Sequence, residues 1–342
     1  MNLRKFGPSV ALALAAWAVS VAAACADEQA AKQSPKKPAA NEGPAKHEPL
    51  FVRLVRDDAG TVVALQTSTV RYVAPDAERK GLIVDLIGVV HIGEKEYYDR
   101  LNKQFEQYDS VLYELVAPEG TRVPKGGAKS KHPVGQVQQM MKNVLELDFQ
   151  LDHVDYHQKN FQHADMSPDD FAKSMADRNE SFFELFLKMM AQGMVQQSKK
   201  GGGTSDADLL LALFDRNRAL ALKRVFAEQF EDLDGAMGAL DGPEGSTLVT
   251  ERNKKALEVL KKDIDDGQKR LAIFYGAGHM PDMAERLEQE FGLKREGREQ
   301  WLTAWNMQSP PKKKTAEKSG KKKSAANQPD GEKQQEADAQ VK

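Results

Sequence analysis

Two histidines in this 342-residue chain stand at the same place in two similar segments. Each segment has the pattern Gly-x-x-His after an apolar run, at Gly88 to His91 and at Gly276 to His279. Imidazole nitrogens bind transition metals and transfer protons near neutral pH. Because the pattern occurs twice, we interpret it as an internal duplication in which each half supplies one imidazole to a shared site.

The segments around the two histidines predict the elements that position them. The apolar runs 82–87 and 271–275 have the composition of short strands buried on both faces. Helices are expected directly after the histidines, at 94–107 and 281–291. In sheets of parallel strands, ligands bind beyond the carboxyl ends of the strands, where helix N-termini point. We therefore expect both histidines at that edge of a sheet.

Glu114 interrupts a third apolar run, 110–116, which follows the first predicted helix. An ionised carboxylate buried there costs several kcal/mol unless a cation or a metal compensates it. A strand-helix-strand crossover makes this strand parallel to the first, so Glu114 and His91 can share one edge. With His279 they form a set that binds zinc, iron, manganese or cobalt. The competing interpretation makes the histidines hydrogen-bonded turn residues and Glu114 a surface group.

Three consecutive polar residues lie in the middle of a predicted helix, 247–262. Helical spacing aligns Arg252 and Asn253 with apolar residues of the inner face. An inward arginine clamps a substrate carboxylate, stabilises an oxyanion, or pairs with a buried acid. We take Arg252 and Glu251 as candidate catalytic residues, and Asn253 and Asp165 as candidates for substrate binding.

Three further histidines lie in the segment 152–165. Their order fits no single metal-ligand spacing, so we expect turn or surface roles for them. Beyond this segment, Ser167 with Pro168 and Asp170 has the pattern of a helix N-cap and capping box. This pattern indicates a structural role for that stretch.

The remaining signals predict an α/β fold. Residues 51–55 and 61–73 flank a turn and predict a hairpin before the first Gly-x-x-His strand, and 300–305 predicts a closing strand. Between the two repeats, 134–230 is expected as a helical insertion. We predict two related strand-GxxH-helix-strand halves that form a mainly parallel central sheet, in a domain covering 50–307.

The first 25 residues have the features of an export signal: a basic start, an apolar stretch and small residues before Cys25, the only cysteine. A cysteine at the cleavage position resembles a bacterial lipoprotein signal, in which it is acylated. Cleavage after Ala24 or Ala26 without lipidation is the alternative. Either way we expect a protein of the cell envelope, periplasmic or anchored to the membrane by the lipid, without an intrachain disulfide.

Polar segments flank the predicted domain. Residues 26–49 and the Lys-rich 308–342 lack apolar periodicity and aromatic residues, and we expect a disordered tether and a disordered tail. The formal net charge is -2, and the tail carries acidic as well as basic residues. Nucleic acid is therefore not an expected partner. The sequence indicates no particular oligomeric state.

Four motifs in one order along the chain resemble the TraB/GumN family: Gly88-Val89-Val90-His91, Tyr113-Glu114-Leu115, Glu251-Arg252-Asn253 and Gly276-Ala277-Gly278-His279. This family belongs to a superfamily with the Tiki membrane metalloproteases, the erythromycin esterases and the haem-binding ChaN lipoproteins. The likeness covers residues 51–306. The chain departs from the family pattern after Met280, where Pro281 and Asp282 stand in place of the glycine commonly found after the histidine.

The resemblance implies an α/β fold of two related halves, a divalent-metal site at His91, Glu114 and His279, and Arg252 near it. The first expected function is an exported metal-dependent hydrolase, protease-like or esterase-like, whose metal-bound water attacks the carbonyl of a peptide or ester substrate. The alternative is an envelope lipoprotein without catalysis that binds haem or metal, or that sequesters a signalling peptide.

Overall fold

The computed structural model describes residues 51–124, 144–181, 206–228, 241 and 245–308. The predicted signal peptide with Cys25, the tether 26–49 and the tail, apart from Gln308, lie outside these residues. The chain divides into two units, 1–309 and 310–342, and all described residues belong to the first. Within the described ranges, no helix is long and apolar enough to cross a membrane.

The described chain contains both strands and helices. The strands are β1 (Val52–Arg56), β2 (Val62–Val73), β3 (Ile83–Val89), β4 (Ile92–Gly93), β5 (Ser110–Tyr113), β6 (Asp148–Phe149), β7 (Phe161–His163), β8 (Arg270–Gly276) and β9 (Lys294–Asn306). The helices are α2 (Lys95–Phe105), α4 (Gln150–His153), α5 (Pro168–Asp177), α7 (Asp206–Leu213), α8 (Arg218–Glu228), the π-helical η1 (Thr247–Glu251), α10 (Arg252–Asp265), the 3-10 turn η2 (Ala277–His279) and α11 (Met280–Gln289).

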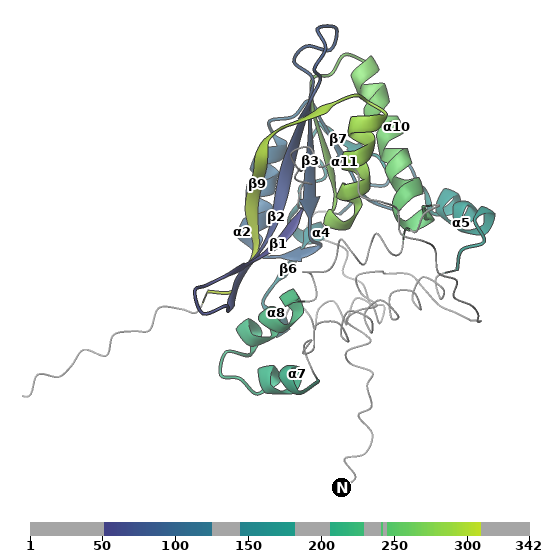
Figure 1. The fold of residues 1–342 in the computed structure, drawn as a ribbon. Helices are drawn as coiled ribbons and strands as arrows, with labels where there is room; N and C mark the ends of the chain where they lie inside the picture. Colours follow the sequence, from purple (N-terminus) through teal and green to yellow (C-terminus); the bar gives the residue numbers. More distant parts are fainter. Residues whose placement is uncertain (1–50, 125–143, 182–205, 229–240, 242–244, 309–342) are drawn as a thin grey trace, which may run out of the picture. The chain divides into compact units, whose positions relative to one another are not determined.

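In the described part of the chain, a seven-stranded mixed sheet organises the fold (Figure 1). β3, β8, β5 and β7 lie in that order and pair in parallel. β2 pairs antiparallel with β1, β3 and β9. β1 and β3 pair with successive stretches of β2, and β9 pairs with residues of both stretches. β9 therefore lies along the opposite edge of β2. The predicted α/β fold is confirmed, and the parallel strands form the half of the sheet that carries both Gly-x-x-His segments.

Both faces of the sheet are covered, which explains the continuous apolar runs of its central strands. In β8, Ala272 and Phe274 belong to the core cluster that includes the apolar face of α2. The alternate residues Leu271, Ile273 and Tyr275 belong to the cluster that includes α10 and α11. Figure 1 shows α10 next to α11, away from α2. The sheet is therefore the middle of three layers.

The helices that follow the two Gly-x-x-His segments pack on opposite faces of the sheet. α2 follows β3 into one core cluster, and α11 follows β8 into the other. β3 and β8 are neighbours in the parallel part of the sheet. Adjacent parallel strands whose connections leave on opposite faces form a crevice at their carboxyl ends, where α/β proteins bind ligands. The fold therefore places both histidines at the edge of the sheet where such a crevice is expected.

The predicted helical insertion, 134–230, contains strands as well as helices. β7 extends the parallel sheet by pairing with β5, and β6 pairs with β4. A strand of three residues is too short for a period-two signal, so the sequence pattern did not indicate β7. The insertion's described helices are α4, α5, α7 and α8, whereas 134–143 and 182–205 lie outside the described residues.

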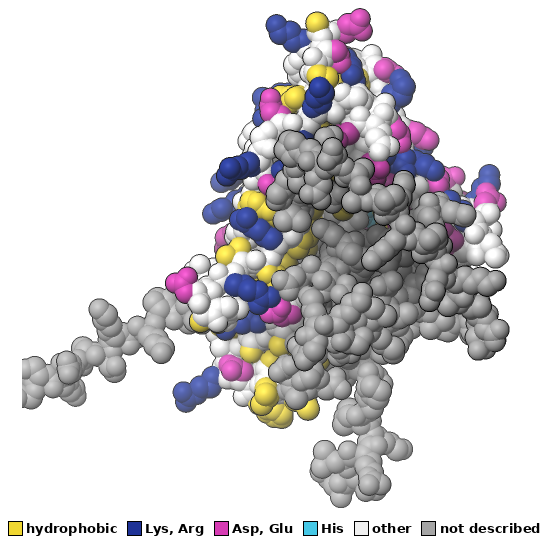
Figure 2. Space-filling model, in the orientation of Figure 1, with side chains coloured by type: hydrophobic (Ala, Val, Ile, Leu, Met, Phe, Trp, Pro, Cys, Tyr) yellow, Lys and Arg dark blue, Asp and Glu magenta, His cyan; other side chains and the backbone are white. Residues whose placement is uncertain are grey.

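The α7–α8 segment is fixed to the sheet through α8 and carries an apolar surface on α7. Lys223 of α8, which is buried, donates to Glu94 at 2.7 Å, and Arg56 pairs with Glu228 at 2.7 Å. Large apolar side chains are exposed on α7 and just after it: Leu210, Leu211, Leu213 and Phe214. Figure 2 shows hydrophobic side chains on the surface in the region where Figure 1 places α7. Such a patch is typical of a contact surface.

Candidate functional site

The structure brings the predicted residues His91, Glu114 and His279 together at the carboxyl ends of β3, β5 and β8. His91 lies two residues beyond β3, Glu114 directly follows β5, and His279 ends the turn η2 after β8. A methyl group placed on Gly276 would lie 3.3 Å from Glu114 Oε2, 3.5 Å from His91 Nε2 and 3.8 Å from His279 Cδ2. Gly276 therefore leaves space between the three side chains that a larger residue would fill.

Two donors from different elements hold the carboxylate of Glu114. The backbone N–H of Gly276 donates to Oε2 at 2.7 Å, and Arg252 Nη2 donates to Oε1 at 2.7 Å. Burial alone would raise the pKa of Glu114, but the positive charge of Arg252 and the Gly276 N–H hold this pKa well below its ordinary value. Glu114 is therefore an ionised carboxylate in a site with little access to water.

Arg252 is the cation at the centre of the cluster. Its Nε and Nη2 donate to the two carboxylate oxygens of Asp165 at 3.0 and 2.6 Å. Its Nη1 lies 3.4 Å from His279 Nε2. Burial alone would lower the pKa of Arg252, but Glu114 and Asp165 raise it above the ordinary value. The Asp165 side chain is fully buried, so it fixes Arg252 and does not face a substrate.

The cluster carries an excess negative charge. With the histidines uncharged, the carboxylates of Glu114 and Asp165 outnumber the single guanidinium of Arg252 by one. Burial lowers the pKa of His279 to about 4, although Glu114 opposes this effect, so His279 is neutral at pH 7. Two carboxylates beside one guanidinium and the neutral, buried imidazole of His279 favour the binding of a cation.

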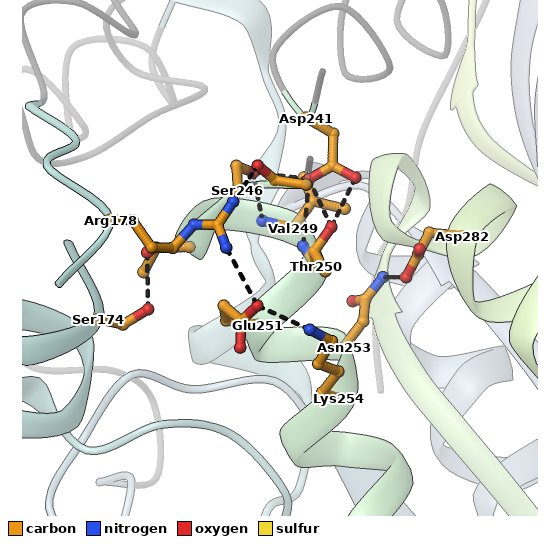
Figure 3. A network of polar contacts seen from close by, with 12 residues as sticks. Ser174, Arg178, Asp241, Ser246, Val249, Thr250, Glu251, Asn253, Lys254 and Asp282 are labelled. Atoms are coloured by element: carbon orange, nitrogen blue, oxygen red, sulfur yellow. Dashed lines mark hydrogen bonds and ion pairs between the residues drawn. The ribbon is translucent and has the colours of Figure 1, made fainter. Parts of the chain in front are cut away.

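Asn253 holds His279 from the side opposite Arg252. Its Oδ1 lies 2.8 Å from His279 Nδ1, and its Nδ2 donates to Asp282 Oδ2 at 2.7 Å. Figure 3 shows the Asn253 amide pointing toward Asp282. The ring of Tyr275 packs edge-on against the imidazole, with centroids 5.3 Å apart. Asn253 is fully buried, so the structure gives it a role in holding His279 and no contact with a substrate.

Gln150 holds His91 in a more open environment. Its Oε1 lies 3.1 Å from His91 Nδ1, and its Nε2 donates to Tyr156 Oη at 2.7 Å. Its backbone N–H donates to the carbonyl oxygen of His91 at 2.9 Å. His91 is exposed, whereas His279 is buried, so the cluster opens on the His91 side. No sequence signal indicates Gln150, because one glutamine at the start of a four-residue helix forms no motif.

Glu251 lies outside the cluster. Its carboxylate accepts from Lys254 Nζ at 2.9 Å and from Arg178 Nη1 at 3.5 Å, as Figure 3 shows. Glu251 is the last residue of the π-helical turn η1, and α10 begins with Arg252. The expected helix over 247–262 therefore begins with a wider turn, a feature that is frequent at functional sites. Of the two candidate catalytic residues, the structure brings only Arg252 to the cluster.

The three histidines of the segment 152–165 make other contacts. His163 donates through Nε2 to the carbonyl oxygen of Leu115 at 2.6 Å, and His157 does so to that of Val123 at 2.8 Å. The ring of His153 stacks on Tyr98. Only His157 is exposed and in a turn, as expected, whereas His153 ends α4 and His163 ends β7, both half-buried. Ser167 caps α5 as predicted, since its Oγ accepts from the backbone N–H of Asp170 at 3.1 Å.

The donor set of the cluster fits a divalent metal in its chemistry. It offers two imidazoles whose Nδ1 atoms are held by amide oxygens, as in protein metal sites, one carboxylate, and an excess negative charge. The present distances are those of hydrogen bonds, since Glu114 Oε1 lies 3.6 Å from His279 Nε2 and accepts from Arg252. Across the described ranges, no group of three His, Cys, Asp or Glu side chains is arranged to hold a metal ion.

Comparison with known proteins adds no relative to this description. No protein-family model, no curated protein and no solved structure matches the chain. The likeness to the TraB/GumN family therefore rests on the four ordered motifs alone, and the family assignment stays a prediction from the sequence.

Proposed function

We propose that this chain is a metal-dependent hydrolase in which His91, Glu114 and His279 bind a divalent cation. The observation that carries the proposal is the space at Gly276, which is bounded by two imidazoles and an ionised carboxylate. Zinc, manganese, cobalt and iron all accept such ligands. A cation bound there supplies a water molecule of lowered pKa and polarises a carbonyl group.

Arg252 has the position and the charge to stabilise an oxyanion. Its guanidinium stays charged, and the fork of hydrogen bonds to Asp165 fixes its orientation before any substrate arrives. Preorganised donors of this kind act where negative charge develops in the transition state. Asp165 serves the reaction as a positioning residue for Arg252.

The substrate in this proposal is a peptide or an ester that reaches the cluster from its open side. His91 is exposed there, whereas Arg252, Asp165 and His279 are buried. The predicted export signal and the acylation of Cys25 would place this reaction in the cell envelope, next to the membrane.

Metal binding and hydrolysis test the proposal separately. Wild-type protein, stripped with a chelator and titrated with Zn²⁺ or Mn²⁺ in a calorimeter, is expected to bind one equivalent. The double variant His91→Ala, His279→Ala is expected to lose this binding, and His157→Ala, which changes a histidine outside the cluster, is expected to keep it. Equal binding by the double variant and the wild type would remove the site from the proposal.

A screen of peptides and esters with metal-loaded protein then tests the reaction. Hydrolysis that a chelator abolishes supports the hydrolase. Metal binding without hydrolysis, together with a haem Soret shift that is lost in the His91 or His279 variant, would favour the carrier function instead.

A further inference from the structure

His279 lies between two consecutive residues of α10. Arg252 Nη1 is 3.4 Å from its Nε2, and Asn253 Oδ1 is 2.8 Å from its Nδ1. His279 and Asn253 are both buried, with 5% and 0% of their surfaces exposed. Each ring nitrogen therefore has a protein partner that restricts which of the two carries the proton.

The orientation of the Asn253 amide follows from its other contacts. Its Nδ2 donates to the backbone oxygen of His279 at 3.0 Å and to Asp282 Oδ2 at 2.7 Å. Both partners are acceptors, and Asp282 Oδ2 also accepts from Arg286 Nε at 2.9 Å. The amide group is therefore oriented by two acceptors, and its oxygen faces the imidazole. Since an amide oxygen only accepts, His279 Nδ1 must be the donor.

We infer that Asn253 is a positioning residue that fixes the proton of neutral His279 on Nδ1 and so directs the Nε2 lone pair into the cluster. The opposite tautomer would place an N–H group at Nε2, where it can neither bind a cation nor accept a proton. The consequence for activity rests on the proposed function, whereas the tautomer itself is a property of the metal-free protein.

The two histidines of the repeated pattern differ in this respect. Gln150 also presents an amide oxygen to Nδ1 of His91, but its Nε2 bonds the hydroxyl of Tyr156. A hydroxyl group both donates and accepts, so the contact with Tyr156 does not determine the orientation of the Gln150 amide. The contacts therefore fix the tautomer of His279. They do not fix the tautomer of His91, which can change when a metal ion binds.

The direct test is ¹⁵N NMR of metal-free protein labelled in the histidine rings, because the two tautomers give opposite patterns of nitrogen shifts. The His279 signals are assigned by their absence from His279→Gln. At pH 7 we expect a protonated Nδ1 and an unprotonated Nε2 in the wild type. A protonated Nε2 would overturn the inference. This measurement uses the wild-type protein, so it does not depend on whether variants of Asn253 fold.

Substitutions at Asn253 separate positioning from packing. Asn253→Leu keeps a similar volume without an acceptor, and we expect a mixture of tautomers and a metal dissociation constant raised about 10- to 100-fold. In the double variant Asn253→Asp, Asp282→Asn, the carboxylate at position 253 accepts from His279 Nδ1. The amide at position 282 then donates to that carboxylate. This double variant should recover the wild-type tautomer and part of the affinity, since the bond from position 253 to the carbonyl oxygen of His279 is not restored.

An unchanged tautomer in Asn253→Leu, or an opposite tautomer in the double variant, would contradict the inference. A wild-type protein with the expected tautomer that binds no metal would leave the inference intact and overturn the proposed function. The two failures are therefore distinguishable.

Discussion

Two arginine–aspartate pairs have the same forked geometry: Arg71 and Asp85 join the neighbouring strands β2 and β3, whereas Arg252 of α10 meets Asp165, two residues after β7. Arg71 donates through Nε and Nη2 to Asp85 at 2.9 and 2.8 Å. Arg252 donates through the same atoms to Asp165 at 3.0 and 2.6 Å. Around the first pair, the hydroxyl of Tyr108 donates to Asp85 at 2.8 Å. One cation and one anion are thus balanced there, and a neutral group completes the contacts.

The second pair differs in what surrounds it. Arg252 also donates to Glu114 and lies next to His279, so a second carboxylate and an imidazole share one guanidinium. A buried ion pair is by itself weak evidence of function, because structural pairs are common. The second pair thus has more charged and ligating groups around it than the first, and the proposed function accounts for this difference.

The largest expected effect tests the structural pair. Asp85→Asn removes the charge of a buried carboxylate that accepts two hydrogen bonds from the half-buried Arg71. We expect the free energy of unfolding to fall by roughly 3 kcal/mol, the lower end for two hydrogen bonds to a charged group. Urea unfolding measures this loss, and calorimetry should show unchanged metal affinity. A variant of wild-type stability would mean that the first pair is not structural.

Low pH should affect the second region through His279, since the Arg71–Asp85 pair contains no histidine. The pKa of His279 is about 4 in the folded protein against an ordinary value of 6.5. Between these values the unfolded chain binds more protons, so stability falls as pH decreases from 6.5 to 4, by about 3 kcal/mol in total. The contribution of Glu114, whose pKa is lowered, is lost at still lower pH, below its ordinary value of 4.5.

Unfolding curves of metal-free protein at several pH values measure this dependence. In His279→Gln, the decline between pH 6.5 and 4 should be smaller by that amount. Parallel curves for the variant and the wild type would show that His279 does not titrate as a buried neutral group.

The smallest expected effect concerns the two glycines of the repeated pattern. A methyl group on Gly276 would lie between Glu114 and His91, so Gly276→Ala should weaken metal binding about tenfold, or about 1.4 kcal/mol. A methyl group on Gly88 would meet only apolar neighbours, with Met280 Cγ at 3.4 Å. Gly88→Ala is therefore the matched control, with normal metal affinity. Equal affinities in the two variants would contradict the position assigned to the site.

The sequence predicted those parts of the fold that have a local pattern. The runs before the two histidines became β3 and β8, and the helices after them became α2 and α11, because apolar spacing reports burial directly. The site residues His91, Glu114 and His279 were found because polar groups at the ends of apolar strands are conspicuous.

Other parts of the site depend on contacts between distant residues. Asp165 and Arg252 are 87 positions apart, and no spacing within either segment indicates that they pair. The amide of Gln150 meets His91 only because a short helix folds against the strand end. Asn253 was placed correctly on the inner face, but its partner there is His279. Long-range partners of this kind are set by tertiary packing, which periodicity does not report.

The most direct test of the central claim compares Glu114→Gln with Asp85→Asn in one calorimetric titration with Zn²⁺ or Mn²⁺. Both changes remove one buried negative charge and keep the size of the side chain. We expect Glu114→Gln to raise the dissociation constant at least about 100-fold, more than the loss of an outer partner, and Asp85→Asn to leave it at the wild-type value. Equal affinities in the two variants would contradict the assignment of the Glu114 cluster as the metal site.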